Sequence, residues 1–201
     1  MQGANDKLEQ EDGNAEYEAL YERGTLNRLE VELLINGKPS GRKRVSRERP
    51  LPGSVRFEGV FEPGVLEAVS YTGGQEVSRD RLETSGPPAA IRLIPEKTQL
   101  KADGHSLAYV AIEITDREGR TVPDAAVFLT AEADGPAFLA GFGSANPVTD
   151  EDYTDGKTVS FRGKALAVLR SASEPGTVEL TVSGENLPAA HLTLAVEKCG
   201  E

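Results

Sequence analysis

The chain has 201 residues, of which 33 are acidic and 22 are basic, so its formal net charge at pH 7 is −11. Such a charge repels nucleic acid and anionic membrane surfaces, whose protein partners carry basic stripes, so we expect no nucleic-acid binding. No apolar run approaches the ~20 residues of a membrane span, so we expect no membrane insertion. The single cysteine, Cys199, has no partner for an internal disulfide.

The N-terminal part predicts a tail and then a small β domain. Residues 1–24 are acidic and polar, and we expect them to be partly disordered. Residues 25–85 predict a small antiparallel β-sandwich. In it, apolar and polar side chains alternate from Leu29 to Ile35, which indicates a half-buried strand. Asn36-Gly37 follows as a strong hairpin signal.

The same domain is predicted to continue through two more segments. Val55, Phe57 and Val60 are expected to extend the sheet. Residues 65–84 then predict a second hairpin around Gly73-Gly74, because paired glycines supply the positive φ of a tight turn.

Residues 86–90 form an expected linker, which two consecutive prolines, Pro87 and Pro88, make semi-rigid. Residues 91–197 predict about seven short strands at roughly ten-residue spacing, the pattern of an immunoglobulin-like sandwich. Pro95 interrupts the first of these strands, so we expect that strand to be divided between the two sheets. The predicted fold is therefore all-β, two tandem antiparallel β-sandwiches, the second of the bacterial immunoglobulin-like kind.

Several short sequence segments occur in the same order and at similar spacing as in a known protein family. They are EPGVLEAVSY at 62–71 and EVSRD at 76–80, VELLINGK at 31–38, KADG at 101–104, and FRGKALAVLRS at 161–171. Over about residues 29–184, the chain resembles the C-terminal accessory region of bacterial β-galactosidases of glycoside hydrolase family 2.

This resemblance implies a non-catalytic role within a longer natural protein. In that family both catalytic glutamates lie on an upstream (β/α)₈ barrel, so we expect no catalytic residue and no cofactor in this chain. The expected partner is the catalytic barrel domain of the parent chain, and any homo-oligomer would form through that parent. Any export signal would lie on the parent as well, so the sequence assigns no compartment.

An acidic stretch gives a weak metal candidate. Asp150, Asp152 and Asp155 lie close together in a segment rich in glycine, asparagine and aspartate, and carboxylate oxygens are ligands that calcium prefers. The spacing does not fit an EF-hand, since Phe161 falls where that motif has its bidentate glutamate. A solvated acidic loop is the alternative and the one that we favour.

Tyrosines give a weak carbohydrate-binding candidate. Aromatic rings offer a flat apolar face to the CH groups of a sugar, and the chain contains no tryptophan. Tyr153, in the acidic stretch, is the best candidate, followed by Tyr109 and Tyr71 on predicted strands. We expect Phe57, Phe61, Phe128 and Phe161 to belong to the cores.

The function expected from these observations is a structural one, beside the catalytic barrel of a β-galactosidase. Two alternatives stay open. One is a carbohydrate-binding module that anchors the parent enzyme to polysaccharide. The other is a stalk or adhesin module at a cell surface, although the two predicted domains differ in length and pattern, which weakens a repeat array.

Overall fold

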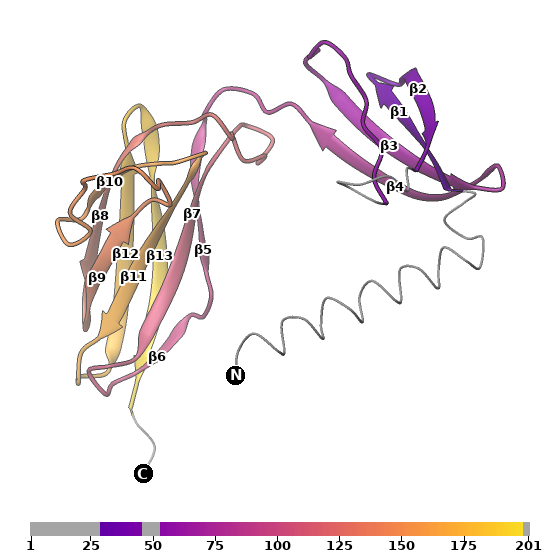
Figure 1. Cartoon of the computed structure of the whole chain (residues 1–201). Helices are drawn as coiled ribbons and strands as arrows, with labels where there is room; N and C mark the ends of the chain where they lie inside the picture. The colour runs from indigo at the N-terminus through magenta and orange to yellow at the C-terminus, as the bar shows by residue number, and fades with distance from the viewer. Residues whose placement is uncertain (1–28, 46–52, 199–201) are drawn as a thin grey trace, which may run out of the picture. The chain divides into compact units, whose positions relative to one another are not determined.

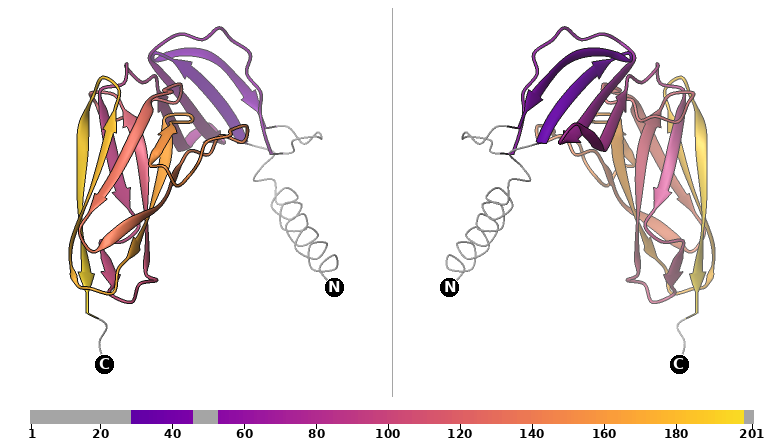
Figure 2. Two further views of the ribbon diagram at one scale, coloured as in Figure 1. Left: turned by 90° about the vertical axis from the view of Figure 1, so that its left-hand side faces the viewer. Right: turned by 90° about the vertical axis from the view of Figure 1, so that its right-hand side faces the viewer.

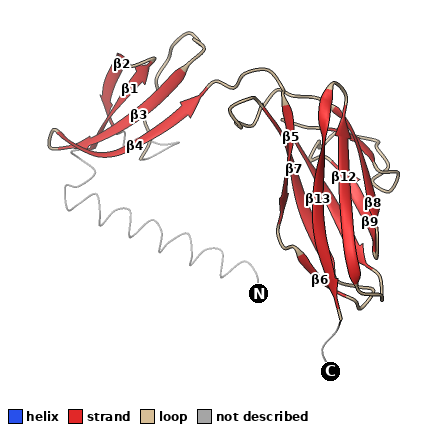
Figure 3. Cartoon of the chain, turned by 180° about the vertical axis from the view of Figure 1, so that it is seen from behind, coloured by secondary structure: helices blue, strands red, loops and turns tan. Residues whose placement is uncertain are grey.

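The structure is a computed structural model that describes residues 29–45 and 53–198. The acidic segment 1–24 and Cys199 lie outside the described residues. The described secondary structure consists of strands joined by turns and loops (Figures 1 and 3). The chain divides into two compact units, Met1–Thr84 and Ser85–Glu201, which are called unit 1 and unit 2 below.

The described part of unit 1 forms one antiparallel sheet in the order β2-β1-β3-β4. Its strands are β1 (Leu29–Ile35), β2 (Lys38–Arg44), β3 (Val65–Thr72) and β4 (Gln75–Glu83).

The hairpin between β1 and β2 has the conformation that its sequence predicts. Asn36 and Gly37 both have positive φ, 51° and 75°, as a type I′ turn requires. The Asn36 side chain also joins this turn to the start of β3, since its Oδ1 accepts the backbone N–H of Val65 at 2.8 Å and its Nδ2 donates to the Pro63 carbonyl at 3.1 Å. The β1–β2 hairpin is thus fixed against the central strand.

The segment before β3 differs from the prediction. Residues 55–64 form no strand, although Val55, Phe57 and Val60 were expected to extend the sheet. Phe61, expected in the core, is 77% exposed. Pro63 and Gly64 at the end of this segment favour a turn. The alternation of Val55 and Phe57 breaks at Gly59, after which two apolar residues are adjacent.

Unit 2 is a sandwich of two sheets, seen as two facing layers in Figures 1 and 2. One sheet has the strand order β5-β7-β11-β9, and the other has the order β10-β8-β12-β13-β6. The strands are β5 (Ala90–Pro95), β6 (Gln99–Lys101), β7 (Leu107–Thr115), β8 (Phe128–Asp134), β9 (Ala137–Gly143), β10 (Lys157–Val159), β11 (Lys164–Ser171), β12 (Gly176–Gly184) and β13 (Leu187–Glu197).

The first strand of unit 2 is divided between the sheets, as predicted from Pro95. β5 pairs with β7 in the four-stranded sheet, and β6 pairs in parallel with β13 in the other. Because proline has no N–H for the ladder, the chain leaves the first sheet at this residue. The crossing ties the two layers together at their edge.

The core lies between the two layers of unit 2. Each strand alternates inward and outward residues, and the inward set is apolar and almost fully buried; it includes Val110, Ile112, Leu169, Leu180 and Leu194. Full burial of each such side chain contributes about 1.5–3 kcal/mol. The core of unit 2 is therefore the main source of its stability.

One aromatic residue expected in the core is exposed, and another for which no expectation was given is buried. Phe142, which was not assigned to the core, is 1% exposed, whereas Phe128, which was, is 46% exposed. Phe128 is next to the buried Leu129 and so points to the opposite face of β8. The face of the strand to which a side chain points, rather than the residue type, decides here whether the side chain is buried.

The all-β fold class is confirmed, with several antiparallel sheets and an immunoglobulin-like sandwich in unit 2. The described residues of unit 1 contribute a single sheet. None of the residues that the structure describes belongs to a helix long and apolar enough to pass through a lipid bilayer.

Candidate functional site

The outward side of the β5-β7-β11-β9 sheet carries an unusual set of apolar side chains. Along β11, Ala165, Ala167 and Leu169 point into the core, whereas Leu166 is 42% exposed and Val168 is half-buried. Together with their outward neighbours on β5 and β7 they form what we call the outer apolar face, made of Ile94, Tyr109, Ala111, Leu166 and Val168.

Strand register arranges this face in two adjacent rows across the sheet. The first row runs through Ile94, Ala111, Leu166 and Gly143. The second row runs through Tyr109, Val168 and Gly141. Each row ends on a glycine of β9, which carries no side chain, so the surface is hollowed on that side.

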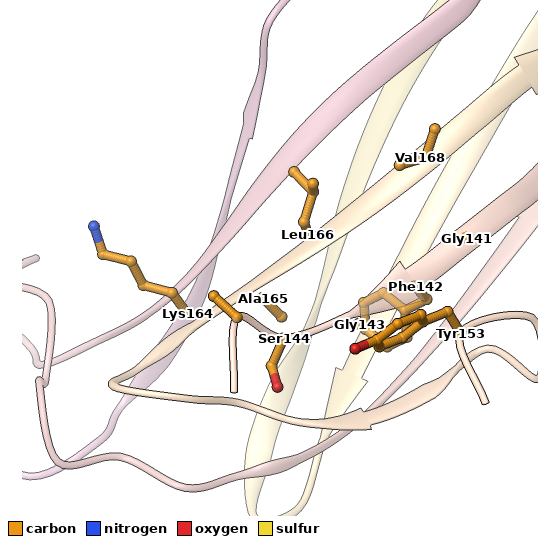
Figure 4. Close-up of a pocket in the computed structure, with 10 residues that line it drawn as sticks. Gly141, Phe142, Gly143, Ser144, Tyr153, Lys164, Ala165, Leu166 and Val168 are labelled. Carbon is orange, nitrogen blue, oxygen red and sulfur yellow. The ribbon is translucent and has the colours of Figure 1, made fainter. Parts of the chain in front are cut away.

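A pocket of about 410 Å³ occupies this hollow. Tyr153 forms one of its walls, because its ring lies directly over Gly143, as Figure 4 shows. A Cβ on Gly143 would lie only 2.4 Å from Cδ1 of Tyr153. The backbone of Tyr153 is held at the same place, since Phe142 N–H donates to its carbonyl at 2.7 Å. Glycine at 143 is thus what lets the loop close onto β9.

The loop that carries Tyr153 is fixed by its own carboxylates. Glu151 accepts hydrogen bonds from the Thr158 hydroxyl and the Val159 N–H, both at 2.8 Å. Asp152 accepts the Thr154 N–H at 2.8 Å and its hydroxyl at 2.7 Å, and these bonds lower the pKa of Asp152. These contacts give Tyr153 a defined position.

The three aspartates considered as calcium ligands do not form a metal site in this structure. Asp152 is engaged as described, and Asp155 accepts the Lys157 N–H at 2.8 Å, so both carboxylates cap turns of their own loop. Within residues 29–45 and 53–198, no group of three His, Cys, Asp or Glu side chains is placed to hold a metal ion. Asp150 is exposed on the same loop.

Charged residues border the outer apolar face. Glu113 on β7 lies between Arg92 and Lys164, pairing with the first and lying 3.3 Å from Nζ of the second. The hydrogen bond from Arg92 is the main reason why the pKa of Glu113 is lowered, with Lys164 and Thr121 adding to it. On the opposite border, the Arg170 guanidinium lies 4.5 Å from the centre of the Phe138 ring.

The three tyrosines that the sequence singled out separate into two places. Tyr153 lines the pocket, and Tyr109 lies opposite Val168 on the same sheet face. Tyr71 belongs to unit 1, where its hydroxyl donates to Glu32 at 3.0 Å and the Arg42 guanidinium covers its ring at 3.9 Å. The bond to Glu32 raises the pKa of Tyr71, and Arg42 occupies one face of its ring.

The pocket also contains a residue that sequence analysis did not identify. The Ser144 hydroxyl is buried and, among the described side chains, is the only such atom without a hydrogen-bond partner. Most buried polar atoms in native proteins have one. Gly141 and Gly143 share one face of β9, since residues two apart on a strand point to the same side, and this spacing of glycines is a sequence signal that could have indicated the hollow.

Comparison with known proteins agrees with this architecture. Beta-galactosidase BoGH2A of Bacteroides ovatus is 36% identical over 169 residues, which are 84% of this chain and 20% of that protein. A beta-glucuronidase of Formosa agariphila is 29% identical over 174 residues, 81% of this chain and 17% of that protein. A solved glycosyl hydrolase family 2 member from Bacteroides cellulosilyticus superposes with a TM-score of 0.80 at 31% identity, covering 84% of this chain and 22% of that one.

The chain therefore spans about a fifth of the length of the relatives that it matches. Residues 27–78 match a domain of unknown function, DUF4982. Residues 91–193, which are more than half of the chain, match Glycoside hydrolase family 2 C-terminal domain 5. The resemblance noted in the sequence is confirmed, and the chain belongs to the glycoside hydrolase family 2 C-terminal domain 5 family.

Proposed function

We propose that this chain is the non-catalytic C-terminal region of a larger family 2 β-galactosidase and acts as a scaffold beside the catalytic barrel. The observation that carries the proposal is the match of nearly the whole chain to about a fifth of a β-galactosidase at 36% identity. The other four-fifths of such an enzyme leave room for a barrel that supplies the chemistry. The parent protein is then a glycosidase that hydrolyses terminal β-galactosides.

Several carboxyl groups of the described residues are engaged in contacts that hold the fold. A retaining glycosidase needs two carboxyl groups about 5 Å apart, one of them an acid with a raised pKa. In the described part of the chain, each carboxyl group with a clear shift has its pKa lowered by hydrogen bonds or ion pairs. These groups are Glu76, Asp103, Glu113, Asp116 and Asp152.

An activity assay tests the proposal. The 201-residue chain and the longer natural chain that contains it are assayed on chromogenic β-D-galactosides and β-D-glucuronides. We expect hydrolysis of the galactoside by the longer chain and none by the 201-residue chain. Hydrolysis by the 201-residue chain alone would refute the non-catalytic role, and a longer chain that prefers the glucuronide would refute the proposed substrate.

A second assay addresses the scaffold role. Removal of residues 85–201 from the longer chain is expected to lower the thermal midpoint of the remaining enzyme while KM for the galactoside changes little. A truncated enzyme with an unchanged midpoint and a raised KM for polysaccharide alone would instead favour the carbohydrate-binding module.

A further inference from the structure

We infer that the outer apolar face, with the pocket beside Tyr153, is the docking surface for an apolar side-chain cluster on the remainder of the same longer chain. This inference rests on the proposed function, because it needs a longer chain with further domains. It adds which of the two sheets of unit 2 meets the rest of the enzyme and which side chains form the contact.

The central strands of the two sheets of unit 2 differ in what they show to the outside. Along β12, in the five-stranded sheet, the outward residues are all polar: Thr177, Glu179, Thr181 and Ser183. Such alternation of apolar inward and polar outward residues is usual for an antiparallel sheet with one solvated side. Along β11 in the other sheet, the two central outward residues are Leu166 and Val168. A contiguous exposed apolar patch of this kind marks an interaction site.

The pocket gives this surface a shape that receives a protruding side chain. Gly141 and Gly143 leave a gap beside Leu166 and Val168, and Tyr153 bounds the gap on its far side (Figure 4). Its walls are chiefly carbon atoms of glycine, alanine, leucine, valine and aromatic residues. A sugar carries a hydroxyl on most of its carbons, and these hydroxyls would find few hydrogen-bond partners in this pocket. Burying a hydroxyl without a hydrogen-bond partner costs free energy. An apolar protein side chain fits these walls better.

The charged residues at the border indicate which part of the face a partner would bury. Arg92 and Lys164 both pair with the single carboxylate of Glu113 within the sheet. Each charged group of this row therefore keeps an ion-pair partner when an apolar surface covers the neighbouring row. Exposed ion pairs at the rim of an interface contribute to specificity more than to affinity. The apolar rows between the two charged borders are therefore the part that would be buried.

The remainder of the longer chain is a better occupant than a second copy. The chain carries a net charge of −11, and two copies meeting face to face would bring like charges together. In contrast, the matched relatives carry about four times as much additional chain around a region of this kind. A partner in the same polypeptide also has a high effective concentration, so a modest apolar patch is sufficient to hold it.

Hydroxyl-radical footprinting of the longer natural chain and of the 201-residue chain tests the inference. In the 201-residue chain, Tyr109 and Tyr153 are exposed and should be labelled. In the longer chain, we expect their labelling to fall at least about five-fold, as in the water-excluding core of an interface. Phe128, which is exposed on the other sheet, is the internal control and should be labelled equally in both.

Three results would overturn the inference. Equal labelling of Tyr109 and Tyr153 in both chains means that this face is free in the enzyme. Protection in the 201-residue chain that rises with its concentration means that a second copy covers the face. Protection of the 201-residue chain by millimolar galactose or lactose assigns the face to carbohydrate. The galactosidase assay of the longer chain separates these outcomes from failure of the proposed function, because hydrolysis can be present while the face stays labelled.

A matched pair of variants gives an independent test. Leu166→Arg places a charge in the centre of the outer apolar face, and Val159→Arg places one on β10 of the other sheet, where Val159 is 40% exposed. In the 201-residue chain both variants should leave the thermal midpoint unchanged. In the longer chain, Leu166→Arg should restore labelling of Tyr109 and Tyr153, and Val159→Arg should not. Equal behaviour of the two variants in the longer chain would contradict the docking face.

Discussion

The backbone N–H of Gly86 donates a hydrogen bond of 2.8 Å to Oδ2 of Asp116. The same carboxylate accepts the backbone N–H groups of Glu118 and Arg120 at its other oxygen, at 3.0 and 2.8 Å, and pairs with the Arg120 guanidinium. Asp116 itself is buried. One carboxylate thus fastens the segment that enters unit 2 to the turn after β7.

Replacement of Asp116 by asparagine should destabilise unit 2. The amide NH₂ would face the Gly86 N–H and the Arg120 guanidinium, which are both donors, so two hydrogen bonds of a buried group are lost. We expect the thermal midpoint of unit 2 to fall by roughly 5–10 °C, measured by circular dichroism. Asp124→Asn makes the same change of charge at an exposed site on the surface of unit 2 and should leave the midpoint unchanged; a similar fall in both variants would contradict this role of Asp116.

The acid stability of unit 2 should depend on the same residue. The Gly86 N–H, followed by the contacts with Arg120, lowers the pKa of Asp116 from 3.8 to about 2. A group whose pKa is lower in the folded state contributes its stability in full above its unfolded pKa and loses it as the pH falls toward its folded pKa. The free energy of unfolding from urea titrations should therefore decline between about pH 4 and pH 2, and less steeply in Asp116→Asn than in the natural chain. Parallel slopes would show that Asp116 does not contribute.

Local signals predicted much of the fold. Asn36-Gly37 gives a type I′ hairpin and Pro95 divides a strand between two sheets, because in both cases a backbone constraint of a few residues decides the outcome. Phe128 was assigned wrongly because residue type was weighed above the phase of the alternation, and Phe61 because its segment forms no strand. Which face of a strand is buried depends on the layer packed against it, and that layer is formed by residues distant in the sequence.

The candidate site was predictable only in parts. Tyr109 and Tyr153 were singled out one by one, but that they share one side of unit 2 follows from the pairing of β7, β11 and β9. Asp152 and Asp155 were weak candidates for calcium ligands, with a solvated acidic loop favoured, and the structure shows that backbone N–H groups of their own loop engage them. Short polar side chains in turns commonly bond to nearby backbone groups, and this competes with any metal.

A methyl group at position 143 should displace Tyr153. Gly143→Ala places a Cβ 2.4 Å from the tyrosine ring, whereas Gly141→Ala meets only the Tyr153 carbonyl at 3.8 Å, an ordinary contact. We expect Gly143→Ala to lower the free energy of unfolding by about 1 kcal/mol and to shift the NMR resonances of the Tyr153 ring, and Gly141→Ala to do neither. An unshifted Tyr153 in Gly143→Ala would contradict the closure of the loop onto β9.

The turn that leads into β11 should tolerate no side chain at position 163. Arg162 and Gly163 both have positive φ, 52° and 71°, and Phe161 and Lys164 exchange backbone hydrogen bonds across them. A Cβ on Gly163 would lie 2.2 Å from the Val122 carbonyl oxygen, which is backbone and cannot move away without breaking its surroundings. We therefore expect Gly163→Ala to cost about 2–4 kcal/mol of unfolding free energy.

Gly119→Ala is the control that separates backbone strain from the steric clash at Gly163. Gly119 also has a positive φ, 80°, but its Cβ would meet nothing nearer than the Arg92 guanidinium at 4.0 Å. Its replacement should cost only the strain of a left-handed conformation, about 1–2 kcal/mol. Urea denaturation of the two variants then isolates the clash with Val122 as the difference. Equal losses would mean that the turn at Gly163 moves away from Val122 to make room for the methyl group.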